Sequence, residues 1–275
     1  MKKNLDEATV DSFGDEWGKF DQNNLSLEEA ESIFNMYFSI FPWEILPENP
    51  VGFDLGCGSG RWAKIVAPKV SLLHCIDPSS ALEVAKKNLN DLNNLSFLKE
   101  SVDELSLEDN SQDFGYSLGV LHHVPDTQEA ISSCVKKLKP GAPFLLYLYY
   151  AFDNRSLFFK FIWRITNLLR KFISLLPSPI KNTLTDLIAI FVYFPLARLS
   201  LVLESLKINN NHIPLSFYKN SSFYTMRTDS RDRFGTPLEQ RFTKNEIYQM
   251  MSSSGLENIS FSDGMPFWCA VGTKR

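Results

Sequence analysis

The stretch Val51-Gly52-Phe53-Asp54-Leu55-Gly56-Cys57-Gly58-Ser59-Gly60 decides how the rest of the sequence is interpreted. Its first five residues are typical of a short buried strand, and a glycine-rich turn and a helix over 61–67 follow. Open α/β sheets bind their ligands at the carboxyl ends of such strands. We therefore expect Asp54 and the alternating glycines to form the centre of a binding site.

Strands and helices alternate along the sequence on both sides of this stretch. The predicted strands are 51–55, 71–76, 95–99, 114–118, 143–150, 256–261 and 267–272. The predicted helices are 26–38, 61–67, 79–88, 126–139 and 243–255. This order predicts a Rossmann-like α/β fold, with a mostly parallel seven-stranded sheet, helices on both faces, an antiparallel last strand and a helical insertion.

The spacing of the glycines separates two classes of cofactor. A dinucleotide fingerprint needs G-x-G-x-x-G, which places a pyrophosphate on a helix N-terminus. Here Gly56, Gly58 and Gly60 alternate, and Asp54 precedes them by two residues. A carboxylate favours a cationic ligand over a phosphate, so an NAD-dependent oxidoreductase is the less favoured alternative.

The composition excludes several classes of protein. The 275 residues include 28 Lys and Arg against 32 Asp and Glu, a net charge of −4, with 44% hydrophobic and 22% charged residues. This balance excludes an intrinsically disordered chain and a collagen-like repeat. The overall acidity and the lack of a recognised RNA-binding module argue against a nucleic-acid partner.

The cysteines and the N-terminal residues bear on the cellular location. Acidic residues follow Met1-Lys2-Lys3, so the sequence predicts no secretory signal. The cysteines are scattered without the spacing of zinc ligands, so we expect no metal site and buried free thiols. They are Cys57, Cys75, Cys134 and Cys269. We expect a cytoplasmic protein.

The segment 155–207 is both basic and apolar. It holds eight basic and two acidic residues, a net charge of +6, which leaves −10 for the rest of the chain. Its longest apolar run, 187–197, has eleven residues and includes Pro195. A membrane-crossing helix needs about 20 apolar residues, so no transmembrane helix is predicted.

Within this segment, residues 157–172 have the pattern of a basic amphipathic helix. Its apolar residues are Leu157, Phe158, Phe161, Ile162, Ile165, Leu168, Leu169 and Phe172. Another face carries Lys160, Arg164, Asn167 and Lys171. Two compatible interpretations stay open: a cap that encloses an acceptor pocket, or a surface over 155–207 that contacts a membrane peripherally or grips a lipid-linked substrate.

From about Pro50 to Tyr150 the sequence resembles the class I S-adenosylmethionine-dependent methyltransferases, particularly the group that includes quinone-biosynthesis and sugar-modifying members. Beyond the glycine-rich stretch, further motifs carry the resemblance in the expected order. They are Asp77 after the second strand, Ser101-Val102-Asp103-Glu104-Leu105, Leu118-Gly119-Val120-Leu121-His122-His123-Val124 and Lys139-Pro140-Gly141.

The resemblance implies S-adenosylmethionine as the cofactor and assigns roles to individual residues. Asp54 and the glycine loop would bind the methionine amino group, Asp77 the ribose hydroxyls, and Val102 would flank the adenine. The family often has Asp at the position of Ser101, so this sequence departs from the pattern there. The predicted cofactor-binding residues are Asp54, Gly56, Cys57, Gly58, Gly60, Asp77, Pro78, Ser101, Val102, Asp103, Leu118 and Gly119.

Two adjacent histidines, His122 and His123, are the predicted catalytic residues. A histidine titrates near neutral pH, so His122 is the candidate general base for a hydroxyl acceptor. The alternative is that both are loop histidines hydrogen-bonded for structure. Trp17 has two similar interpretations, a lid over the cofactor or a packed aromatic side chain.

The sequence thus predicts four segments. Residues 1–45 form an N-terminal helical segment, 46–150 the cofactor-binding core, 151–225 a helical insertion, and 226–275 the completion of the sheet. The resemblance implies a methyltransferase acting on a small-molecule, saccharide or lipid-linked acceptor, at oxygen. A non-catalytic membrane-surface or adaptor protein that keeps the same fold is the alternative from a different class.

Overall fold

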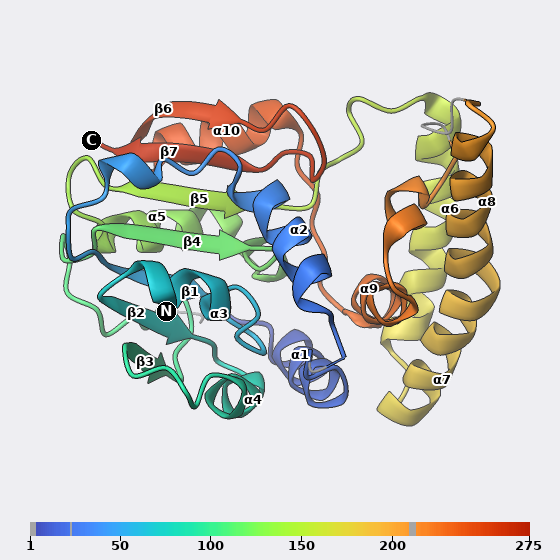
Figure 1. Cartoon of the computed structure of the whole chain (residues 1–275), viewed down its shortest axis with the longest axis horizontal. Coiled ribbons are helices and arrows are strands. Elements are labelled where there is room, and N and C mark those ends of the chain that lie inside the picture. The colour runs from blue at the N-terminus through green and yellow to red at the C-terminus, as the bar shows by residue number, and fades with distance from the viewer. Residues whose placement is uncertain (1–3, 23, 209–212) are drawn as a thin grey trace. The chain divides into compact units, whose positions relative to one another are not determined.

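A computed structural model describes residues 4–22, 24–208 and 213–275 of the chain (Figure 1). The chain divides into two compact units, which we call unit 1 and unit 2. Unit 1 comprises Met1–Asp21, Ala30–Asp153 and Leu238–Arg275. Unit 2 comprises Gln22–Glu29 and Asn154–Pro237. The insertion therefore extends beyond 225, the position at which the sequence analysis placed its end.

Unit 1 contains a seven-stranded sheet with the order β3-β2-β1-β4-β5-β7-β6. Its strands are β1 (Val51–Leu55), β2 (Leu72–Ile76), β3 (Leu95–Leu98), β4 (Phe114–Leu118), β5 (Pro143–Tyr147), β6 (Leu256–Phe261) and β7 (Ala270–Lys274). The first five strands pair in parallel, and β7 pairs antiparallel with both β5 and β6. This arrangement confirms the predicted fold class.

Alternate residues of the strands point to two separate hydrophobic cores. On one face, Leu73 and Cys75 pack with side chains of α2, α3 and α4, and on the other, Phe53 and Leu55 pack with α5 and α10 (Figure 1). The helices are α2 (Leu27–Phe38), α3 (Ala63–Val66), α4 (Ala81–Asn88), α5 (Thr127–Lys137) and α10 (Lys244–Ser253). All four cysteines are buried and free, as predicted.

Three details of unit 1 differ from the sequence analysis. A helix that was not predicted, α1 (Glu7–Lys19), begins where the side chain of Asp6 accepts a 2.9 Å hydrogen bond from the Thr9 N–H. The predicted helix 61–67 is shorter and ends in a 3₁₀ turn at Pro68. The last strand begins at residue 270, because the Cys269 N–H closes a turn onto the Pro266 carbonyl.

Unit 2 is helical. Its main helices are α6 (Leu157–Ser174), α7 (Ser178–Ile188), α8 (Phe194–Ser205) and α9 (Phe223–Gly235). A π-helical turn, η4 (Ala189–Tyr193), joins α7 and α8 into one continuous helix of 28 residues. Pro195 lies just after this π-helical turn and has no N–H to donate within the continuous helix, so the turn marks the point where the regular hydrogen-bond pattern is interrupted. The helix is long and apolar enough to cross a membrane, a length that the eleven-residue run did not reveal.

Candidate functional site

The glycine loop joins β1 to the next helix at the carboxyl edge of the sheet. Gly56, Gly58 and Gly60 have φ angles of +78°, +53° and +82°, a region that favours glycine. A Cβ at Gly56 would lie 2.3 Å from Val120 Cγ2, and one at Gly60 would lie 2.6 Å from Leu89 Cδ1. Both the backbone conformation and the close packing therefore require glycine.

Asp77 follows β2 and holds the glycine loop in place. Its Oδ2 accepts a 2.9 Å hydrogen bond from the Gly58 N–H. Its Oδ1 accepts from the Ser79 N–H at 2.8 Å and from the Ser79 hydroxyl at 2.6 Å. Because each carboxylate oxygen can accept more than one hydrogen bond, Asp77 retains acceptor capacity for a ligand.

Asp54 is buried beneath the loop near the end of β1. Its Oδ2 has no hydrogen-bond partner among the described residues. Burial raises the pKa of Asp54 from 3.8 to about 8, and the Tyr116 hydroxyl opposes this rise. A nearby cation would stabilise the carboxylate, so this unsatisfied oxygen fits the positively charged amino group of the cofactor that the resemblance implies.

The loop after β3 presents Ser101 and Val102 to a cavity in unit 1. The Ser101 hydroxyl donates a 2.6 Å hydrogen bond to Asp103 Oδ1, and the Asn4 N–H donates to Asp103 Oδ2 at 3.0 Å. Asp103 thus positions the loop and does not line the cavity. Val102 offers an apolar side chain to a flat ring.

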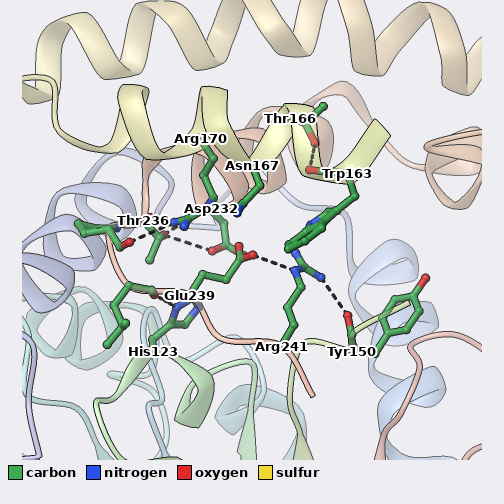
Figure 2. A network of polar contacts seen from close by, with 12 residues as sticks. His123, Tyr150, Trp163, Thr166, Asn167, Arg170, Asp232, Thr236, Glu239 and Arg241 are labelled. Atoms are coloured by element: carbon green, nitrogen blue, oxygen red, sulfur yellow. Dashed lines mark hydrogen bonds and ion pairs between the residues drawn. The ribbon is translucent and has the colours of Figure 1, made fainter. Parts of the chain in front are cut away.

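His123 also lines this cavity, and its tautomer is defined by a backbone contact (Figure 2). Its Nδ1 lies 2.6 Å from the Leu238 carbonyl oxygen, which can only accept a hydrogen bond. The neutral ring therefore carries its proton on Nδ1, and Nε2 keeps the lone pair. The ring also makes an edge contact with Phe13, at a centroid distance of 4.9 Å.

His122 is fully buried and is not among the residues that line the cavity. Its ring stacks on Tyr149 at 3.8 Å, and neither nitrogen has a hydrogen-bond partner among the described residues. Burial, then the neighbouring His123 and Arg241, hold the pKa of His122 well below its usual range. Arg241 itself donates to Glu239 at 2.8 Å and to the Tyr150 carbonyl at 3.3 Å (Figure 2).

The structure brings most of the predicted cofactor-binding residues together around one cavity. Those that line it are Gly56, Cys57, Gly58, Asp77, Pro78, Ser101, Val102, Leu118 and Gly119. The other three lie outside the lining. Asp54 is buried under the loop, Gly60 packs on Leu89, and Asp103 supports the loop after β3.

The N-terminal helix α1 and the residues before it supply a wall of the cavity, of which the sequence analysis considered only Trp17, as one of two interpretations. Its lining residues are Asn4, Leu5, Asp6, Thr9, Val10, Phe13 and Trp17. Trp17 lies close above the loop, because a Cβ at Gly58 would be 3.1 Å from its Nε1. The signal was present as the Asp6 cap followed by Val10, Phe13 and Trp17 at helical spacing.

Comparison with known proteins agrees with this geometry. Residues 53–146 match the family model of a methyltransferase domain. Phosphoethanolamine N-methyltransferase 2 of Caenorhabditis elegans is 35% identical over 100 residues, which cover 35% of this chain and 23% of that protein. A ubiquinone biosynthesis O-methyltransferase of Saccharophagus degradans is 34% identical over 91 residues, which cover 32% of this chain and 39% of that protein.

The chain thus aligns with well under half of the length of these curated relatives. A solved structure supports the fold over a longer range. A chain from the complex between the Haloferax volcanii Trm112 methyltransferase activator and a methyltransferase aligns with a TM-score of 0.50 and 13% identity, covering 94% of this chain and 96% of that chain. The motifs, the cavity and the matching family model together identify residues 53–146 as a methyltransferase domain of the class I S-adenosylmethionine-dependent type, whose cofactor is S-adenosylmethionine.

Proposed function

We propose that this protein transfers a methyl group from S-adenosylmethionine to a hydroxyl group of a small-molecule acceptor. The observation that carries the proposal is that His123 lines the same cavity as the glycine loop and Asp77. When bound, the cofactor supplies an electrophilic methyl group on a sulfonium centre. The name of one relative, a ubiquinone biosynthesis O-methyltransferase, supports oxygen as the acceptor atom.

The residues around the loop hold and orient the cofactor in this proposal. The loop backbone holds the amino group, Asp54 beneath the loop supplies the opposite charge, Asp77 binds the ribose hydroxyls, and Val102 packs on the adenine. The side chains of Phe13 and Trp17, from α1, exclude water from the cavity. Alignment and a dry site are the main contributions a protein makes to a displacement of this kind.

His123 serves as the general base. Its Nε2 lone pair accepts the proton of the acceptor hydroxyl, while the Nδ1–H bond to the Leu238 carbonyl fixes the ring orientation. His122 is a poorer candidate because it is fully buried, lies outside the lining and is held in its neutral form by burial. We assign it a packing role between His123 and Tyr149.

Two titrations test the cofactor assignment. We expect calorimetry of the purified protein to give saturable binding of S-adenosylhomocysteine and none of NADH, and we expect Asp77→Ala to abolish the former. Binding of NADH alone would favour an NAD-dependent oxidoreductase over a methyltransferase. Binding of neither, with the protein folded, would favour the non-catalytic adaptor.

The base assignment is tested by turnover on a panel of phenolic, saccharide and lipid-linked hydroxyl acceptors. His123→Ala should lower turnover about 100-fold, the usual contribution of a positioned base, and leave the affinity for S-adenosylhomocysteine unchanged. His74→Gln, on β2 and outside the cavity, is the matched control and should retain full turnover. Undiminished turnover by His123→Ala would contradict the role of His123 as base.

A further inference from the structure

The exposed apolar side chains of this protein are concentrated in unit 2. Outside 157–208, the described residues include only five large apolar side chains that are exposed: Leu27, Ile45, Phe223, Tyr248 and Met265. On α6 alone, Leu157, Phe158 and Leu168 are 83%, 72% and 70% exposed. Soluble proteins seldom expose a contiguous apolar surface of this extent unless it contacts a partner or a membrane.

The interior of unit 2 combines a small hydrophobic cluster, which includes Ile173, Met226 and Phe234, with buried charged side chains. Arg170, Lys181 and Arg231 are all buried. Arg170 donates to the Thr236 carbonyl at 2.7 Å (Figure 2), Lys181 to the Gly235 carbonyl at 3.1 Å, and Arg231 to Asn182 Oδ1 at 2.9 Å. In helical proteins that contact lipid, the polar side chains face the interior and the apolar side chains face outward.

The long helix α7–η4–α8 follows the same inverted pattern. Its buried positions recur about every four residues and are mostly small or polar: Lys181, Thr185, Ala189, Tyr193, Ala197 and Ser200. Its exposed positions include Leu187, Phe191 and Val202. Only 22% of its most apolar window is buried, whereas the core helix of a soluble protein is mostly buried.

Helix α6 adds positive charge beside its apolar face. At about 100° per residue, its exposed apolar side chains fall within an arc of about 120°. Lys160, Arg164 and Lys171 fall together along one border of that arc, and none has an ion-pair partner among the described residues. An apolar face bordered by cations matches the boundary between acyl chains and anionic headgroups.

The sheet of unit 1 constrains how unit 2 can meet a membrane. The chain leaves unit 1 after β5 and returns to form β7, which pairs antiparallel with β5. Both ends of unit 2 therefore lie on the same side of a bilayer, which excludes a single crossing by α7–η4–α8. A second crossing by α6 is excluded too, because its 18 residues include Lys160, Arg164, Arg170 and Lys171.

We propose that unit 2 binds the surface of an anionic membrane, with α6 and α7–η4–α8 lying in the interfacial plane. Their apolar faces enter the headgroup and acyl boundary, and Lys160, Arg164 and Lys171 contact lipid phosphates. Charge complementarity selects lipid over a second copy of the chain, since the net charge of +6 over 155–207 would repel the same segment of another copy.

Vesicle co-sedimentation of the full chain tests this proposal. Vesicles of phosphatidylcholine alone are compared with vesicles in which about a third is phosphatidylglycerol, and we expect strong binding only to the latter, weakening as salt is raised. Lys160→Gln/Arg164→Gln/Lys171→Gln should lower the partition coefficient about 100-fold. The matched control, Lys64→Gln/Lys87→Gln/Lys136→Gln, removes three exposed lysines of unit 1 and should bind as the wild type does.

A second pair of variants tests the apolar contribution. Phe161→Ser/Phe172→Ser removes two exposed rings and should lower vesicle partition by about 100-fold without unfolding the protein, as judged by circular dichroism. Unchanged partition by either multiple variant, or equal binding to both vesicle types, would overturn the proposal. A lipid-free dimer in light scattering that Phe161→Ser/Phe172→Ser dissociates, together with no vesicle binding, would instead assign the surface to a second copy.

Discussion

Units 1 and 2 differ in how they divide apolar side chains between interior and surface: unit 1 has two large buried cores, whereas unit 2 has one small buried cluster and many exposed apolar side chains. Unit 1 packs Phe53, Phe114 and Phe144 inside its sheet layers, whereas unit 2 encloses Arg170, Lys181 and Arg231 and presents Phe158 and Phe161 outward. In unit 1 the hydrophobic effect in water determines the packing. In unit 2 the exposed apolar helix faces fit the membrane contact proposed above. The comparison teaches that two parts of one chain can place most of their apolar side chains on opposite sides, and each unit can be tested separately.

Replacing one phenylalanine of each unit by alanine should give the largest difference between the units, measured as the change in the free energy of unfolding. Phe144→Ala leaves a cavity in the core of unit 1 and should lower the free energy of unfolding by about 3–5 kcal/mol. Phe161→Ala, at a position 59% exposed, should change it by less than about 0.5 kcal/mol in lipid-free buffer. Urea titration followed by circular dichroism measures both. A large loss for Phe161→Ala would show that this side chain contributes to the folded packing of unit 2.

The separation of ligand binding between the units gives a second contrast. Gly56→Ala forces a side chain into a positive φ and against Val120, so the affinity for S-adenosylhomocysteine should fall about 100-fold or more. Gly264→Ala, whose Cβ would meet no neighbour within 4 Å, is the control. Vesicle binding by Gly56→Ala should be that of the wild type. Joint loss of both activities would mean that the units do not function separately.

The pH dependence of stability gives the smallest expected effect. The folded-state pKa of Asp54 is raised by burial to about 8, so the folded protein holds this proton more tightly than the unfolded chain. Its contribution to stability is fully present below about pH 4 and is lost as the pH rises through 8. Between pH 6 and 8 the free energy of unfolding should fall by about 2 kcal/mol from this group.

Asp54→Asn should flatten that profile and raise the melting temperature at pH 9, while abolishing cofactor binding. Thermal melts of the ligand-free protein from pH 5 to 9 measure this. The exposed Asp263→Asn is the control and should keep the wild-type profile. A profile unchanged by Asp54→Asn would show that the carboxylate is stabilised in the fold despite its unpaired Oδ2.

Much of the fold and of the cofactor site was predictable because its signals are local. Short strand–turn–helix sequences contain Asp54, the glycine loop and Asp77. The alternation of strands and helices then determines the edge of the sheet at which these residues lie. The predicted helix 243–255 corresponds to α10, whose start is defined locally by a capping box between Thr243 and Glu246. In these cases, residues that are close together in the sequence determine the local structure by themselves.

The remaining features depend on distant parts of the chain. Helix α1 has a clear cap at Asp6, yet its place over the glycine loop is fixed by tertiary packing, such as that of Gly14 against Ser80. His122 and His123 are neighbours with similar chemistry, and only the backbone turn decides which one lines the cavity. The amphipathic pattern of α6 was visible, but which face is covered depends on where Arg170 finds its carbonyl partners.

The position of β7 between β5 and β6 has a consequence for synthesis on the ribosome. β5 is made before the helices α6 to α9 of unit 2, and its partner β7 is made more than 100 residues later. Until then one edge of β5 has no partner strand, and the apolar helices of unit 2 have already emerged. The nascent chain thus exposes an unpaired strand edge and an apolar helical surface together, and early contact of unit 2 with lipid, as proposed above, would remove one of these two aggregation hazards.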